Sequence, residues 1–99
     1  MSSFKEIIKG EKPVLIDFHA TWCGPCQTMS PIIDEIKHLY GDKLRVLKID
    51  VDKNQQASAK YKVRGVPTFL LFKNGEIQWR SAGIQSRKDL IAQVEKALK

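Results

Sequence analysis

The chain has 99 residues, of which 42% are hydrophobic and 28% charged, and its formal net charge is +6. This length and composition predict a single soluble globular domain over residues 1–99 and exclude a disordered chain. No apolar run approaches the ~20 residues that a membrane-spanning helix needs. The 17 lysines and arginines are interleaved with acidic residues, which predicts a solvated basic surface and no nucleic-acid-binding arm.

The first predicted elements are a short helix and a buried strand. Ser3 and Glu6 form a capping box for a helix over residues 3–9. The apolar run over residues 14–19 is typical of a buried strand. Asp17 lies in the middle of this run, where an ionised carboxylate is costly to bury, so we expect its pKa to be raised.

The next stretch, Trp22-Cys23-Gly24-Pro25-Cys26, contains both cysteines of the chain. Apolar residues with helical spacing follow it, which predicts a helix over residues 24–40. The pair therefore lies where a strand ends and a helix begins. The unpaired N–H groups and partial positive charge of a helix N-terminus favour a thiolate at Cys23, which we expect to be the more accessible sulfur. Because the thiolate is the nucleophile in disulfide exchange, this position predicts a redox-active dithiol.

The second half of the chain predicts further strands and helices around the same sheet. A strand after the helix over residues 24–40 completes a right-handed parallel βαβ unit. Asn74-Gly75 is a strong hairpin signal, and Ser86 with Asp89 caps a last helix. The expected elements are a strand over 44–51, a helix over 54–61, strands over 68–72 and 77–80, and the helix after Ser86.

Two motifs together resemble the thioredoxin family. The stretch from Ala20 to Cys26 is similar to the family's active-site signature, and Gly65-Val66-Pro67-Thr68 is similar to its cis-proline loop. The resemblance extends over residues 4–99 and implies an α/β thioredoxin fold, with a central mixed four-stranded sheet flanked by helices. Because only 22 residues precede Cys23, we expect the additional N-terminal edge strand of the family to be missing.

The resemblance also implies catalytic roles. Cys23 would attack a client disulfide, and Cys26 would resolve the resulting mixed disulfide, as a general protein disulfide reductase does. Asp17 would move a proton to or from Cys26, and Lys48 would influence the proton affinity of Asp17. His19 stands where the family more often has Trp, and it either tunes the thiols, because histidine titrates near neutral pH, or only packs.

The resemblance further implies a client-binding surface around the dithiol. A cis Pro67 would place the backbone of Val66 beside the two sulfurs, where it can pair with an extended peptide. Glycines would let that peptide approach, and Trp22 would supply an apolar contact surface. The expected substrate-binding residues are Trp22, Gly24, Pro25, Gly65, Val66, Pro67 and Gly83.

Expectations about cofactors, partners and compartment follow from the same resemblance and from the N-terminal residues. No cofactor is expected to be bound, and NADPH and FAD would act only through a partner thioredoxin reductase. The expected partners are this reductase and disulfide-containing client proteins. No binding to nucleic acid or to a membrane is expected, and the protein is expected to be a monomer. Residues 1–6 lack the apolar core of a secretory signal, which predicts a cytoplasmic location.

Other functions of a Cys-x-x-Cys pair are less consistent with the sequence. A disulfide oxidase or isomerase usually carries His in place of Pro25, and a redox-sensing interaction module stays open as an added role. A zinc site from Cys23, Cys26 and His19 would lack the fourth ligand of a closed structural site, so no metal is expected. A purely structural disulfide is disfavoured because so small a loop constrains the unfolded chain little.

Overall fold

The computed structural model describes residues 3–99, and its elements match the expected types in the expected order, except for a short 3₁₀ helix at 41–43 that the sequence did not predict. Their ends differ from the predicted ends by at most two residues. The largest difference is in the last strand, which is longer because it pairs with its neighbour along its whole length. The elements are α1 (Phe4–Ile8), β1 (Val14–His19), α2 (Gly24–Tyr40), the short 3₁₀ helix η1 (Gly41–Lys43), β2 (Arg45–Asp50), α3 (Gln55–Lys60), β3 (Thr68–Lys73), β4 (Glu76–Ala82) and α4 (Arg87–Leu98).

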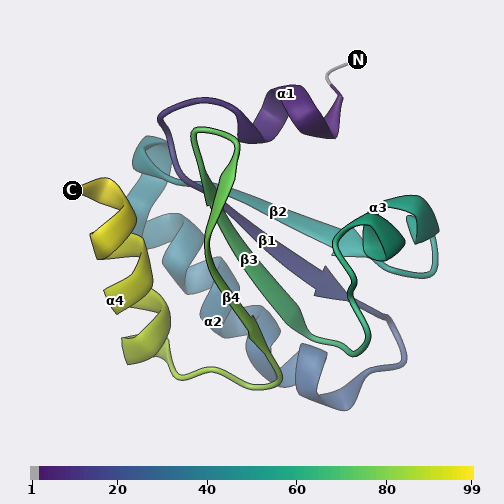
Figure 1. Cartoon of the computed structure of the whole chain (residues 1–99). Coiled ribbons are helices and arrows are strands. Elements are labelled where there is room, and N and C mark those ends of the chain that lie inside the picture. The colour runs from purple at the N-terminus through teal and green to yellow at the C-terminus, as the bar shows by residue number, and fades with distance from the viewer. Residues whose placement is uncertain (1–2) are drawn as a thin grey trace.

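The four strands form one mixed sheet in the order β2-β1-β3-β4 (Figure 1). Strands β1 and β2 are parallel, and β3 is antiparallel to both of its neighbours, which confirms the predicted mixed sheet. Within residues 3–99 no strand precedes β1, so β2 is an edge strand. The central strand β1, which leads into the cysteine pair, is held on both sides.

Local signals in the sequence set the ends of several elements. The Ser3 side chain accepts the Glu6 N–H at 3.2 Å, and the Ser86 side chain accepts the Asp89 N–H at 3.0 Å, as expected for helix caps. Asn74 and Gly75 have φ values of 56° and 79°, which fit the two central positions of a type I′ hairpin turn.

Alternating side chains of the central strands fill two cores, one on each face of the sheet. Leu15, with Phe69 and Leu71 of β3, packs under α2 and α4. Ile16 and Phe18 pack on the opposite face, against apolar residues of α1 and α3. Because successive side chains of a strand point to opposite faces, Asp17 lies on the face of Leu15, under α2. Among the described residues no helix is long and apolar enough to cross a membrane.

Candidate active site at the Cys23–Cys26 disulfide

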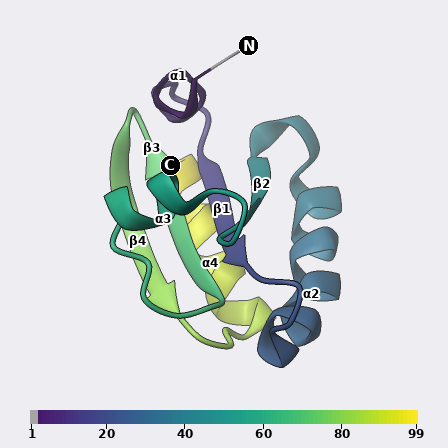
Figure 2. The ribbon, with the colours of Figure 1, turned by 90° about the vertical axis from the view of Figure 1, so that its right-hand side faces the viewer.

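The cysteine pair lies at the junction between β1 and α2, as predicted. Figure 2 shows β1 running to one end of the sheet, where a short loop leads into the first turn of α2. Cys23 is the N-cap residue of α2, and Pro25 lies in the first turn, where its missing N–H removes no helical hydrogen bond. The two cysteines form a disulfide, with Cα atoms 5.2 Å apart, within the range of ordinary disulfides.

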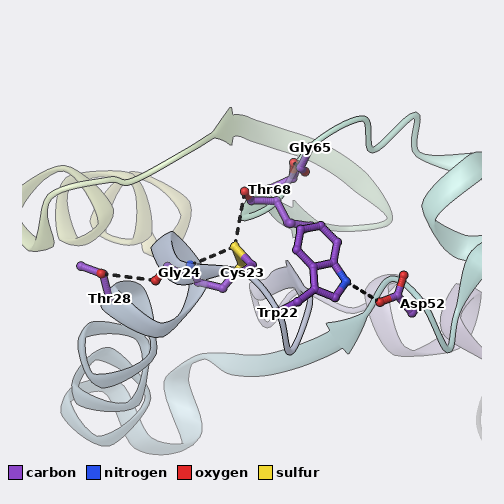
Figure 3. The surroundings of a disulfide bond; sticks show 9 residues. Trp22, Cys23, Gly24, Thr28, Asp52, Gly65 and Thr68 are labelled. Atoms are coloured by element: carbon purple, nitrogen blue, oxygen red, sulfur yellow. Dashed lines mark hydrogen bonds between the residues drawn. A yellow bond between two sulfur atoms is a disulfide. The ribbon is translucent and has the colours of Figure 1, made fainter.

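The sulfur of Cys23 is placed where negative charge is stabilised. The backbone N–H of Cys26 donates to Cys23 Sγ at 3.1 Å, so this sulfur caps the helix N-terminus (Figure 3). In the reduced protein the same N–H and the positive end of the helix dipole would stabilise a Cys23 thiolate. Cys26 is already inside the helix, and its sulfur does not receive a helix-capping N–H.

Solvent exposure does not distinguish the two cysteines as predicted. Cys23 is 4% exposed and Cys26 is 7% exposed, so the expectation that Cys23 is the more accessible is wrong for the oxidised state. Tertiary packing is the reason, because both cysteines pack with Ala20 against Val51 and Val66. What distinguishes the sulfurs is their surroundings. Cys23 lies beside Val66, whereas Cys26 borders a cavity that Asp17 also lines.

The loop before β3 brings backbone groups to the sulfurs. The Val66–Pro67 peptide bond is cis, as predicted, and the carbonyl oxygen of Val66 lies 3.6 Å from Cys23 Sγ. Thr68 Oγ1 donates to the Gly65 carbonyl oxygen at 2.6 Å, which holds this loop in place. The N–H of Gly83, a residue with a φ of 87°, donates to the Pro67 carbonyl oxygen at 2.8 Å. The predicted Val66 therefore lies at Cys23, and the predicted Gly83, from a third segment, contacts Pro67 of the same loop.

A shallow apolar depression adjoins this loop. Its volume is about 370 Å³, and it is lined by Trp22, Val51, Val63, Arg64, Gly65 and Val66. A Cβ atom added at Gly24, Gly65 or Gly83 would meet no heavy atom within 4 Å, so the space next to these predicted substrate-binding glycines is open. The arrangement is compatible with an approaching peptide, and the binding roles of these residues stay predictions.

Trp22 is held by a partner that sequence reasoning missed. Its indole is 70% exposed, and Nε1 donates to Asp52 Oδ2 at 2.8 Å, which orients the ring beside the disulfide (Figure 3). Asp52 follows β2, which runs parallel to β1. The carboxyl ends of the two strands meet at the same edge of the sheet, and this topological signal could have identified Asp52 as a residue of the site.

Asp17 and Cys26 border the same cavity, which Val66 does not line. This cavity of about 290 Å³ is also lined by His19, Ala20, Thr21, Gln27, Ser30 and Lys48. Asp17 is only 4% exposed, and its Oδ1 atom has no hydrogen-bond partner among the described residues. The structure thus brings together the carboxyl and the second sulfur that the proton-transfer hypothesis requires, although the transfer itself stays a prediction.

The expected direction of the Asp17 pKa is confirmed. Burial raises the pKa of this carboxyl, and nearby His19 and Lys48 partly oppose the rise, while Asp34 adds to it. Lys48 lies opposite Asp17 in the β1–β2 register, and its ammonium donates to Asp34 Oδ1 at 2.7 Å and to Ser30 Oγ at 3.3 Å. Lys48, which was predicted to influence Asp17, and His19 therefore both lie close enough to affect this carboxyl electrostatically. An effect of His19 on the thiols stays a prediction.

The side chains around the disulfide suit sulfur chemistry. Across residues 3–99, no group of three or more His, Cys, Asp or Glu side chains is arranged to hold a metal ion. The site instead combines a dithiol pair, a helix N-terminus beside the first sulfur, and a buried carboxyl beside the second. These features define the class of proteins that exchange dithiols for disulfides on a mixed α/β sheet.

Comparisons with known proteins agree with this class. The family model described as Thioredoxin matches residues 1–96. The chain is 49% identical to chloroplastic thioredoxin Y of rice, Oryza sativa subsp. japonica, over 98% of this chain and 58% of the rice protein. It is 44% identical to the thioredoxin of Rickettsia typhi, over 97% of this chain and 92% of that protein. The solved thioredoxin Mala s 13 of Malassezia sympodialis superimposes with a TM-score of 0.87 at 36% identity, covering 100% of this chain and 89% of that chain.

The chain belongs to the thioredoxin family. It spans less than two thirds of the length of the plant relatives, 58% for rice and 57% for Arabidopsis thaliana. Family membership together with the Cys23–Cys26 pair is in keeping with thiol–disulfide exchange in general.

Proposed function

We propose that this protein is a general protein disulfide reductase that works by dithiol–disulfide exchange. The reduced Cys23 sulfur, as thiolate, attacks one sulfur of a client disulfide, and the other client sulfur leaves as a thiolate that takes up a proton. Cys26 then attacks Cys23, the Cys23–client bond breaks, and the protein retains a Cys23–Cys26 disulfide. The single observation that carries the proposal is the Cys26 N–H donated to Cys23 Sγ at the N-terminus of α2.

The second step needs Cys26 to lose its thiol proton. Asp17 is the candidate acceptor, because it lines the cavity that Cys26 borders and has an oxygen without a partner there. Since the attack of Cys26 on Cys23 is intramolecular, proximity makes it fast once the proton is removed. Asp17 therefore takes the role of general base in resolution and general acid in the reverse reaction.

Client peptides would bind in an extended conformation across the cis-proline loop. The Val66 backbone beside Cys23 supplies the polar groups for strand-like pairing, and the exposed indole of Trp22 supplies apolar contact. The open space at Gly65 and Gly83 supports the same path. Recognition of this kind depends on backbone and apolar contacts, which is appropriate for a reductase with many clients.

The electrons would return through a partner flavoprotein, a thioredoxin reductase, which would use NADPH and FAD while this protein binds neither. We expect a monomer that serves electron transport and cell redox homeostasis in the cytoplasm, where dithiols are kept reduced. The plant relatives are named as chloroplastic, so immunoblotting of cell fractions is the direct test of the compartment.

Two measurements test the function. Trapping with a Cys26→Ser variant should accumulate a mixed disulfide between Cys23 and a client, whereas a Cys23→Ser variant should trap nothing. The reduction potential of the Cys23–Cys26 pair should lie near about −270 mV, the value typical of thioredoxin. A potential of about −180 to −120 mV would instead indicate the alternative, a disulfide oxidase or isomerase.

The other alternative is a redox-sensing interaction module without catalysis. Replacing both cysteines by Ser separates the two functions, because catalysis would vanish while a purely structural interaction with a partner would survive. If multiple turnovers of a disulfide peptide by the wild-type protein and a reductant are no faster than the reductant alone, the reductase proposal is wrong.

A further inference from the structure

The cavity that Cys26 borders contains a second titratable side chain besides Asp17. His19 lies two residues after Asp17 on β1, so both side chains are on the face of the sheet under α2, and both line the cavity. Asp17 is buried, whereas His19 is half-buried at the end of the strand. The imidazole therefore shares the cavity with the buried carboxyl and is itself partly open to solvent.

Few side chains in the cavity can accept a proton from Asp17. Once Asp17 has accepted the Cys26 proton, the carboxyl must release it before the next cycle. Thr21, Gln27 and Ser30 do not exchange protons readily at neutral pH, and the ammonium of Lys48 is a donor already paired with Asp34. Imidazole is the one side chain whose ordinary pKa, about 6.5, suits transfer at neutral pH in either direction.

We propose that His19 is a positioning residue that passes the proton between the Asp17 carboxyl and solvent when Cys26 closes the disulfide. This role rests on the proposed reductase function and adds a route by which the proton leaves the Asp17 carboxyl. In the resolving step the S–S bond between Cys23 and the client breaks, and its electron pair leaves with the client sulfur as the Cys26–Cys23 bond forms. The Cys26 proton moves to Asp17, then through His19 to water, so no additional oxidant or reductant is needed.

Electrostatics around the cavity are consistent with this role. A positive charge on His19 lowers the pKa of Asp17, so the two side chains are close enough to interact electrostatically. The charged groups that face this pair are Lys48 and Asp50 of β2, opposite Asp17 and His19 in register, and Asp34 of α2. On the β3 side the residue opposite Asp17 is Phe69, which is apolar. The cavity of about 290 Å³ has room for water between the two side chains.

The test compares His19→Gln with a matched control, His38→Gln. His38 is the other histidine of the chain and lies exposed near the C-terminal end of α2, outside the cavity. A pre-reduced protein is mixed with a disulfide peptide, and release of the peptide thiol is followed over a range of about pH 5.5 to 8.5. Formation of the mixed disulfide is measured separately in a Cys26→Ser background with and without His19→Gln.

We expect His19→Gln to slow resolution about tenfold near neutral pH, because water in the cavity offers only a slower parallel route. Mixed-disulfide formation should be unchanged, free imidazole in the buffer should restore the rate, and His38→Gln should behave as wild type. An unchanged resolution rate and pH profile in His19→Gln would overturn the inference while leaving the reductase function intact. Slowing of both steps without rescue by imidazole would also overturn it, since this result indicates a structural role. A wild-type protein that does not reduce the peptide would instead refute the proposed function.

Discussion

Replacing Asp17 by Asn should stabilise the oxidised protein at neutral pH. The carboxyl is 4% exposed, burial raises its pKa, and its Oδ1 atom lacks a partner among the described residues. Leaving a buried polar group unsatisfied costs about 1–3 kcal/mol, and more when the group is charged. His19 and Lys48 recover part of this cost by attraction to the ionised form, so we expect a net gain of about 1–3 kcal/mol on removing the charge.

The stability gain of Asp17→Asn over wild type should increase as the pH rises. Because the pKa of Asp17 is higher in the folded than in the unfolded protein, the folded state binds the proton more tightly. The wild-type protein therefore loses stability relative to the variant as the pH rises from the unfolded-state pKa through the folded-state pKa. The difference should be complete above the folded-state value and should shrink toward about pH 3, where the carboxyl is protonated in both states.

Thermal and urea unfolding of the oxidised proteins measure this difference, because the disulfide-bonded cysteines do not titrate. At neutral pH the Tm of Asp17→Asn should exceed that of wild type by at least about 4 °C for a domain of this size. The control Asp42→Asn removes an exposed carboxyl and should change stability by no more than about 0.5 kcal/mol. A stability gain that is the same at every pH, or a less stable Asp17→Asn protein at neutral pH, would refute the reasoning.

Two other substitutions test separate parts of the structure. Lys48→Met should raise the pKa of Asp17, because the ammonium that favours the ionised carboxyl is lost. An NMR titration of the Asp17 carboxyl carbon measures this pKa. A titration midpoint that does not move to higher pH would contradict the prediction. Ser86→Ala removes the side-chain acceptor at the N-terminus of α4 and should lower the free energy of unfolding by about 1 kcal/mol, a Tm decrease of about 4–8 °C. Equal Tm values for Ser86→Ala and wild type would show that this cap contributes nothing to stability.

The local sequence was sufficient to predict the elements and the location of the dithiol. Hydrophobic periodicity, the Ser3 and Ser86 caps and the Asn74-Gly75 turn act over a few residues, so they can be recognised without knowledge of the fold. The same holds for the position of Cys23 at a helix N-terminus, which follows from the strand before it and the helix after it. The burial of Asp17 was predictable as well, because both of its neighbours in the strand are large and apolar.

Only the tertiary structure decided which groups meet the sulfurs and how exposed these sulfurs are. Val66 is 43 positions from Cys23, and Asp52 is 30 positions from Trp22, so both contacts depend on strand pairing across the sheet. The near-equal burial of the two cysteines follows from packing against Val51 and Val66, which no local pattern reveals. The cavity that Cys26 borders likewise requires the register of β1 against β2 and the position of α2 above them, because long-range contacts, not sequence neighbours, enclose Asp17 and His19.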